Sequence, residues 1–109
     1  MIGGTVEQRT SALQLANHVR YVRAELKREL WTMTHTAGMV RVADVLEAPI
    51  PELENMKVLA LLKSFYRLGD AKVNRLMTQA GISQTRTIGG ITGRQRACLV
   101  ALLRGETGE

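Results

Sequence analysis

Apolar residues recur at steps of three and four through the first third of the chain, which is the spacing of one face of an α-helix. The stripe consists of Leu15, Val19, Val22, Leu26, Leu30 and Met33. Thr5 and Gln8 stand three residues apart at its start, as the two partners of a capping box do. The pattern therefore predicts one long helix over residues 6–34, with a single buried stripe.

Shorter helical patterns follow this segment and are separated by proline. Residues 41–48 (RVADVLEA) predict a short helix that Pro49 and Pro51 bring to an end. Residues 53–66 carry a second set of apolar positions at helical spacing and predict a third helix. Its inward residues are Met56, Leu59, Leu62 and Phe65.

Two further helices are predicted after Gly69. The first has an apolar face at the i, i+3, i+4, i+7 spacing, and Gly81 fits the left-handed residue that ends a helix. That face consists of Val73, Leu76, Met77 and Ala80. Thr92 and Gln95 form a candidate capping box before the apolar run ACLVALL, which predicts a heavily buried last helix over residues 93–104.

The whole chain has the size and composition of one folded domain. It has 109 residues, of which 45% are hydrophobic and 23% charged. We predict an all-α fold of about five helices, with the long helix and its join in residues 1–40 and a compact core in residues 41–109. Without an apolar run of membrane-spanning length or a signal-peptide pattern, the sequence predicts a cytoplasmic protein with no membrane partner.

The sequence offers no candidates for catalysis or metal binding. His18 and His35 stand apart from cysteine and carboxylate at ligand spacing, and the single Cys98 excludes an intrachain disulfide. Cys98 is interpreted as a small buried residue. Nucleophile-elbow, P-loop and H-E-x-x-H motifs are missing. We therefore predict no catalytic residue, no metal and no cofactor.

Positive charge is concentrated in the second half of the chain. Residues 57–104 hold nine basic side chains and one acidic side chain, Asp70, whereas residues 1–56 hold six basic and seven acidic ones. Such an excess favours a polyanionic partner. The alternative is a solvated basic surface that serves solubility.

A glycine turn in FYRLGDAKVNRL is the first candidate binding element. At the start of the helix after Gly69, backbone N–H groups point outward with a partial positive charge, so the turn can seat a phosphate. Lys72 and Arg75 lie one turn further along and would extend the contact. A helix hairpin that merely turns on glycine gives the same pattern.

The stretch GISQTRTIGGITGRQR over residues 81–96 is the second candidate, because it is basic and lacks carboxylates. Arg86 can make a paired contact to a phosphate or to a guanine edge. The other candidates are the hydroxyls of Thr85 and Thr87, the backbone at Gly89, Gly90 and Gly93, and the cations Arg94 and Arg96. Turn geometry alone would also explain the glycines.

A basic ridge runs beside the apolar stripe of the long helix. It consists of Arg9, Arg20, Arg23 and Lys27. These side chains either contact a partner or form a solvated flank of the helix near Glu25 and Glu29, and the sequence leaves both roles open.

The motifs NMKVLALLKSF, LGDAKVNRLMTQAGIS and TRTIGGITGRQR, in that order, resemble the actinobacterial (mycobacterial-type) integration host factor family, and RYVRAELKREL resembles its long N-terminal helix. The resemblance covers most of residues 15–104. It implies a small all-helical monomer with a helix-two-turns-helix core like that of ribosomal protein S13. Such a protein would bind and bend duplex DNA with little sequence preference, associate with the nucleoid and assist phage integrase recombination.

The resemblance also assigns site residues. The family's helix-turn element falls on Leu68, Gly69, Asp70, Ala71, Lys72 and Val73. Its arginine-rich loop falls on residues 86–96, where this chain has Thr87 and Gly89 in place of two arginines of the family. Arg20, Arg23 and Lys27 become a candidate second DNA contact, and the segment of residues 30–42 is longer and less basic than the family's join.

Two other classes of function stay open beside DNA binding. One is an RNA- or ribosome-binding module of the S13 kind, although the chain ends on the acidic Glu106 and Glu109 instead of a basic tail. The other is a helical protein-interaction module, for which an exposed apolar patch would be the expected sign.

Overall fold

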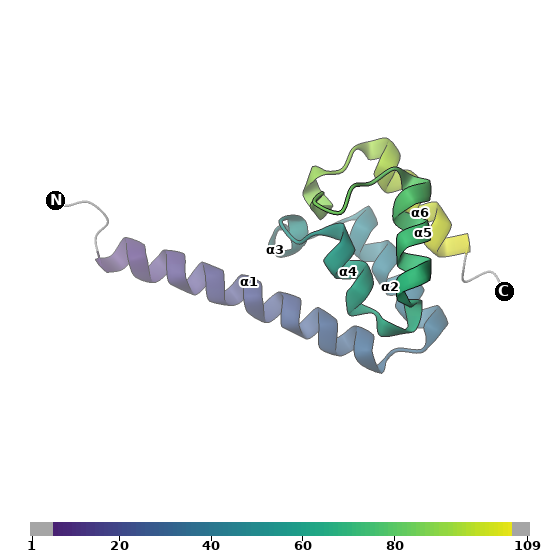
Figure 1. Cartoon of the computed structure of the whole chain (residues 1–109). Helices are drawn as coiled ribbons and strands as arrows, with labels where there is room; N and C mark the ends of the chain where they lie inside the picture. Colours follow the sequence, from purple (N-terminus) through teal and green to yellow (C-terminus); the bar gives the residue numbers. More distant parts are fainter. Residues whose placement is uncertain (1–5, 106–109) are drawn as a thin grey trace.

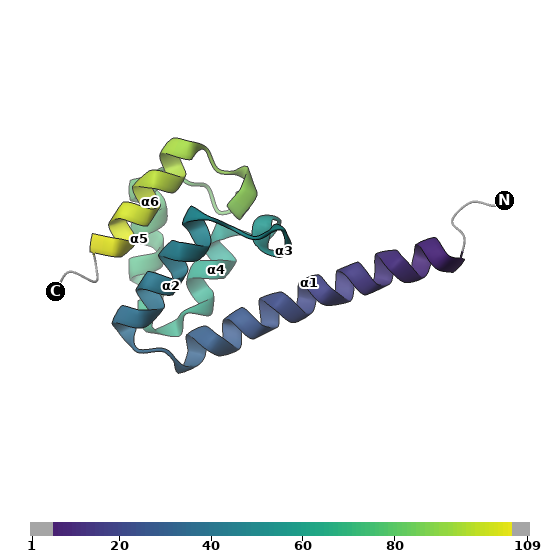
Figure 2. The same cartoon turned by 180° about the vertical axis from the view of Figure 1, so that it is seen from behind.

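The computed structural model describes residues 6–105 as an all-α fold (Figure 1). Its elements are α1 (Val6–Thr32), α2 (His35–Glu47), α3 (Pro51–Glu54), α4 (Val58–Ser64), the 3-10 turn η1 (Tyr66–Leu68), α5 (Asp70–Ala80), the 3-10 turn η2 (Ile88–Gly90) and α6 (Gly93–Gly105). The body of α2 to α6 is compact, and α1 projects from it as an arm, so that the molecule measures 59 × 29 × 21 Å (Figures 1 and 2). The predicted fold class is confirmed. None of the helices described is long and apolar enough to cross a bilayer.

The long first helix is buried only toward its C-terminal end. Leu26 and Leu30 are buried against the body, whereas Leu15 is 63% exposed. The predicted buried stripe is therefore wrong for the N-terminal part, because α1 packs on the body mainly through α3 and α4 and its N-terminal part extends beyond them (Figure 1). The proposed capping box at Thr5 lies outside the described residues.

The second helix begins earlier than its apolar pattern predicts. The hydroxyl oxygen of Thr34 accepts a hydrogen bond from the N–H of Ala37 at 3.2 Å, which caps the helix. Gly38 then lies directly against the ring of Phe65, where an added Cβ would come within 2.1 Å of the ring. A glycine is needed here for close packing.

The single helix predicted over residues 53–66 is wrong, because the structure breaks it into α3 and α4. Asn55 ends α3 in a turn, and Lys57 is extended and pairs with Thr87 in an isolated antiparallel bridge. The N–H of Val58 and the carbonyl oxygen of Met56 make hydrogen bonds with the loop before α6 in place of bonds within a continuous helix. A tertiary contact thus overrides the local pattern.

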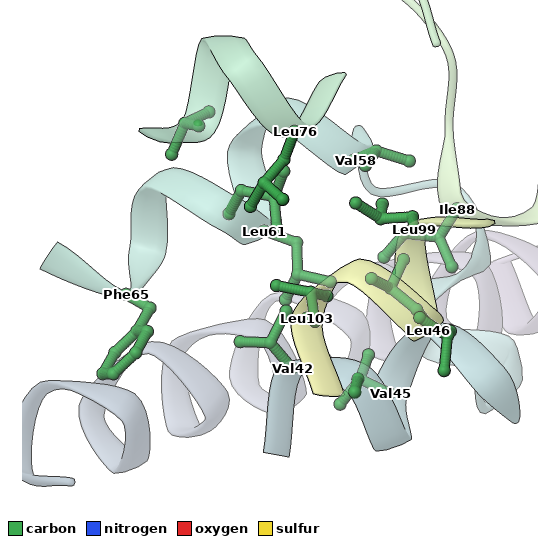
Figure 3. Packing of buried hydrophobic residues seen from close by; sticks show 14 of the residues in the cluster. Val42, Val45, Leu46, Val58, Leu61, Phe65, Leu76, Ile88, Leu99 and Leu103 are labelled. Atoms are coloured by element: carbon green, nitrogen blue, oxygen red, sulfur yellow. The ribbon is translucent and has the colours of Figure 1, made fainter. Parts of the chain in front are cut away.

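A hydrophobic core joins the helices of the body. Val42 of α2, Leu61 of α4, Leu76 of α5 and Leu103 of α6 point toward one another (Figure 3). Val73, Leu76, Met77 and Ala80 are all buried, which confirms the face predicted for α5. The described residues contain no buried polar or charged side chain.

The last helix is less buried than predicted. It packs between α2 and α5, which leaves one side open, and both Ala97 and Ala101 are exposed. Cys98 is half-buried, not buried, with its Sγ 3.9 Å from the carbonyl oxygen of Gln79. The apolar run therefore overstates how much of α6 faces the core.

Candidate nucleic-acid interface

The turn between α4 and α5 depends on Gly69. Its φ of 82° and ψ of 147° lie in a region that other residues rarely adopt. The helix begins immediately afterwards, and its first ladder bond runs from the N–H of Val73 to the carbonyl oxygen of Gly69 at 3.0 Å. The N–H groups of the first turn of α5 consequently point out from the helix end, where an anion can approach.

The side chains predicted at this turn divide into two sets. Leu68 and Val73 are buried and support the turn from inside, so they cannot touch a ligand with their side chains. Asp70, Ala71 and Arg75 are exposed, and Lys72 is half-buried on the same helix. Asp70 also suits the positive end of the α5 dipole.

The loop between α5 and α6 is fixed by backbone hydrogen bonds. The N–H of Val58 donates to the carbonyl oxygen of Arg86 at 3.0 Å, and the N–H of Ile88 donates to the carbonyl oxygen of Met56 at 2.8 Å. These bonds flank the bridge of Thr87 and hold the loop against the junction of α3 and α4. The backbone that carries Arg86 is therefore rigid, while its side chain is exposed.

Both ends of the loop carry the caps that the sequence predicts. Gly81 has a φ of 68°, and its N–H bonds to the carbonyls of Met77 and Thr78, which confirms it as the residue that ends α5. Thr92 and Gln95 exchange two hydrogen bonds of 3.0 Å, which confirms the capping box of α6. The Nε2 of Gln95 also donates to the carbonyl oxygen of Gly81 at 2.7 Å and so ties the two ends together.

Arg96 differs from the other cations predicted at the site. Its two terminal nitrogens donate to the carbonyl oxygens of Leu46, at 2.6 Å, and Ile88, at 2.8 Å, in a partly buried position. The guanidinium thereby joins the end of α2 to η2. Arg94, two residues earlier in the first turn of α6, is exposed.

The other residues predicted in the loop have local roles as well. The hydroxyl oxygens of Ser83 and Thr85 lie 3.3 Å apart at the surface. An added Cβ on Gly89 would meet Glu54 at 3.1 Å, and one on Gly90 would meet the hydroxyl of Thr87 at 2.7 Å. The two glycines thus serve close packing of the loop.

Sequence reasoning missed one cation at this surface. Lys57 is exposed and pairs with Thr87, so it lies one residue from Arg86 in space although it is far away in the chain. The pairing is tertiary, and no local pattern in the sequence indicates it.

The turn and the loop lie at opposite ends of α5 (Figure 1). Gly69 precedes the eleven-residue helix and Gly81 follows it, so the twelve residue steps between them, at about 1.5 Å each, give a separation of roughly 18 Å. The hydrogen bond between Val58 and Arg86 agrees, since Val58 begins α4 and the turn at Gly69 follows its other end. The structure therefore presents two separate elements and not one continuous site.

The basic ridge of α1 is not uniform. Arg20 is exposed and donates to the Oδ1 of Asn17 at 3.1 Å, and Lys27 is exposed. Arg23 is partly buried, and its Nε has no hydrogen-bond partner within the described part of the chain. The side chain of Arg9 lies outside the described residues.

Ion pairs neutralise several charges away from the two elements. Arg28 pairs with Glu25 on α1, and Arg41 joins Glu29 at 3.1 Å across α1 and α2. Arg104 of α6 binds both carboxylates of α2, and its hydrogen bond with Glu47 raises the pKa of the guanidinium. The turn and the loop themselves carry Lys72, Arg75, Arg86 and Arg94, with Lys57 beside the loop.

The acidic groups of the described residues do not form a metal centre. Within residues 6–105, no three His, Cys, Asp or Glu side chains gather where they could hold a metal ion. The Nε2 of His18 instead donates to the carboxylate of Glu52 at 2.9 Å and fastens α1 to α3.

Known proteins are similar to this chain over the region that contains the turn and the loop. The S13-like H2TH domain family matches residues 36–103. Integration host factor from Mycolicibacterium smegmatis and from Mycobacterium tuberculosis are each 39% identical to the chain over 98 residues, which cover 88% of this chain and 89% of theirs. The chain belongs to the integration host factor family. Integration host factor from Streptomyces coelicolor is 33% identical over 95 residues, covering 87% of this chain and 86% of its own.

The domain that defines the family resemblance contains both candidate elements. The match begins within α2 and ends within α6, so it includes the turn at Gly69 and the loop that carries Arg86. The resemblance to the integration host factor family is confirmed. No solved structure gives a significant match to the chain.

Proposed function

We propose that this member of the integration host factor family is a non-enzymatic architectural protein that binds duplex DNA as a monomer, through phosphates and with low sequence specificity. The observation that carries the proposal is the rigid, exposed placement of Arg86 at one end of α5, with the N-terminus of that helix presented at the other. Both elements attract anions, the loop through the guanidinium of Arg86 and the turn through the backbone N–H groups of α5.

The distance between the two elements suits a duplex. Roughly 18 Å along α5 is enough to span the major groove of B-DNA, which is about 12 Å wide. The turn at Gly69 and the side chain of Arg86 can therefore contact phosphates on the two sides of one groove, with Lys57 beside Arg86 and Arg75 beside the turn. Phosphate contacts position a protein on DNA without reading bases, which supports low specificity.

We further propose that binding bends the duplex. DNA bends when the additional interactions that a bent duplex makes with the protein offset its deformation energy. The helix α1 offers further cations at Arg20 and Lys27, along an arm that projects from the body (Figure 2). The biological setting proposed is the nucleoid in the cytoplasm, where the protein organises DNA or assists phage integrase recombination. The name shared by its curated relatives supports this setting.

Competition binding tests the proposal. A labelled duplex DNA is titrated with the protein and then challenged with unlabelled duplexes of several sequences, single-stranded DNA, duplex RNA and heparin. We expect duplexes of different sequence to compete within about tenfold of one another, because few side chains can read bases. A single sequence preferred a thousandfold would contradict the low specificity, and energy transfer between dyes on the two duplex ends measures the bend.

An RNA- or ribosome-binding module is the second candidate. The observation that favours it is the S13-like character of the matched domain. Duplex RNA that displaced DNA from the protein at lower concentration than duplex DNA does would replace the proposal by this candidate.

A further inference from the structure

Two exposed aromatic side chains stack on each other where α1 meets η1. The ring centroids of Trp31 and Tyr66 lie 4.3 Å apart, at an interplanar angle of 39°. Trp31 is 62% exposed and Tyr66 47% exposed, so each ring keeps a large surface open to solvent. The neighbouring Phe65, in contrast, is completely buried in the core.

Cations surround this pair. A hollow of ≈ 460 Å³ beside it is lined by Lys27, Trp31, Ala60, Lys63 and Ser64. The Cζ of Arg67 lies 5.4 Å from the centroid of the Tyr66 ring, within the range of a cation–π interaction. The lining of the hollow contains no carboxylate.

We propose that this aromatic cluster, consisting of Trp31, Tyr66, Lys27, Lys63 and Arg67, binds single-stranded DNA. Aromatic rings on which bases stack and cations that follow the backbone are the two components by which proteins bind unpaired strands. A base stacks on the open face of Trp31, and adjacent phosphates lie against Lys27 and Lys63 in the hollow. The inference rests on the proposed function in one respect, namely that the nucleic acid is DNA.

Charge complementarity favours an unpaired DNA strand over an apolar partner at the aromatic cluster. An apolar partner that covered the rings would also have to remove three cations from water, which is costly without anions to pair with them. An unpaired strand supplies π-faces and phosphates at the spacing of successive nucleotides. It therefore satisfies the rings and the cations together.

The position of the aromatic cluster relates it to duplex binding. Tyr66 and Arg67 belong to η1, directly before Gly69, and the end of α1 lies beside the turn from α4 to α5 (Figure 2). A strand that leaves a duplex bound at this turn reaches the aromatic cluster within a few nucleotides. We therefore expect a duplex with a single-stranded extension to bind more tightly than a blunt one.

Tryptophan fluorescence tests the inference directly, because Trp31 is the only tryptophan of the chain. Titration with a short oligo(dT) should quench its emission in a saturable manner. Tyr66→Ala and Lys63→Ala should weaken the binding measured by this quenching at least fivefold. Tyr21→Ala is the matched control, since Tyr21 lies on the same helix and is also 62% exposed, and it should change nothing.

Binding of a labelled oligo(dT), followed by fluorescence anisotropy, allows Trp31 itself to be changed. Trp31→Ala should weaken binding by roughly five- to a hundredfold, the loss expected for one stacked base. Trp31→Phe should retain most of the affinity, because a ring remains. Blunt duplex DNA should bind Trp31→Ala within about twofold of the unchanged protein, and thermal melting followed by circular dichroism checks that each variant is folded.

The outcomes separate this inference from the proposed function. Blunt duplex binding without quenching by oligo(dT) would overturn the inference and leave duplex binding in place. Failure of every DNA to bind would overturn both. Equal quenching by oligo(rU) would overturn the choice of DNA as the polymer, whereas quenching by oligo(dT) that Tyr66→Ala weakens and Tyr21→Ala does not would support the inference.

Discussion

The carbonyl oxygen of Arg86 accepts a hydrogen bond of 3.0 Å from the N–H of Val58, so the backbone of this exposed loop arginine is anchored to the first residue of α4. A second bond, from the N–H of Ile88 to the carbonyl oxygen of Met56, holds the other side of the same loop. A side chain on a fixed backbone loses less conformational entropy when it binds. The loop therefore acts as a preorganised support for Arg86.

Removal of the guanidinium of Arg96 should weaken the fold. Arg96→Ala leaves the partly buried carbonyls of Leu46 and Ile88 without their donor, and we expect it to lower the free energy of unfolding by about 2–4 kcal/mol. Thermal and urea unfolding followed by circular dichroism measure the loss. Arg94→Ala removes the same charge from an exposed position on the same helix and should leave stability within about 0.5 kcal/mol.

Arg96→Lys separates geometry from charge. A lysine ammonium keeps the charge but cannot extend a planar fork to both carbonyls. We expect it to recover less than half of the lost stability. Full recovery would show that the two hydrogen bonds do not matter.

Gly69 should be intolerant of a side chain for conformational reasons. Gly69→Ala has open space for its Cβ, but its φ of 82° is strained for alanine, and we expect a loss of about 1–3 kcal/mol in unfolding free energy. Gly93→Ala also has open space, without a positive φ, and serves as the control. Equal melting temperatures for the two variants would rule out the strain.

An arginine at Thr87 should strengthen DNA binding. Thr87→Arg places a second guanidinium next to Arg86 on the same fixed backbone, so one more phosphate contact forms and the slope of log affinity against log salt becomes steeper by about one. Val40→Arg adds the same charge at an exposed position of α2, outside the proposed interface. Equal gains from the two variants would mean that only net charge matters.

The stability that the contact between α1 and α3 contributes should be lost at acidic pH. A backbone hydrogen bond, and then the hydrogen bond from His18, lower the pKa of Glu52 below its ordinary value of 4.5. A carboxylate with a lowered pKa in the folded state contributes stability above pH 4.5, and this contribution is lost as the pH falls through the folded pKa. The difference in melting temperature between the unchanged protein and Glu52→Gln should therefore be present above pH 4.5 and vanish in more acidic buffer.

A matched control makes that pH dependence specific. Glu54→Gln removes the second carboxylate of the same short helix and should not reproduce the effect. A difference between the unchanged protein and Glu52→Gln that persisted unchanged into strong acid would contradict the account.

Local sequence patterns predicted the features that local interactions determine. The apolar face of α5 and the capping box of Thr92 and Gln95 depend on residues within one or two helical turns, and both are present as predicted. The break between α3 and α4 was missed because it arises from pairing of Lys57 with Thr87, a residue far away in the chain.

The candidate site was predictable in composition but not in arrangement. Arg94 and Arg96 have the same chemistry two residues apart, and only the fold decides that Arg96 reaches the carbonyls of Leu46 and Ile88. Helical spacing likewise says nothing of the stacking of Trp31 on Tyr66, because the two rings come from distant elements. Packing between elements is the information that a single sequence lacks.

The salt dependence of duplex binding tests the central claim most directly. With about six phosphate contacts, the slope of log affinity against log salt should be roughly −5 for the unchanged protein. Arg86→Ala should make the slope shallower by about one and reduce the affinity by about 1–3 kcal/mol with an unchanged melting temperature. Arg41→Ala, which removes a cation paired with Glu29 on the α1–α2 side, should leave both quantities unchanged. If Arg86→Ala binds DNA as tightly as the unchanged protein at every salt concentration, the loop is only a connector and the account is wrong.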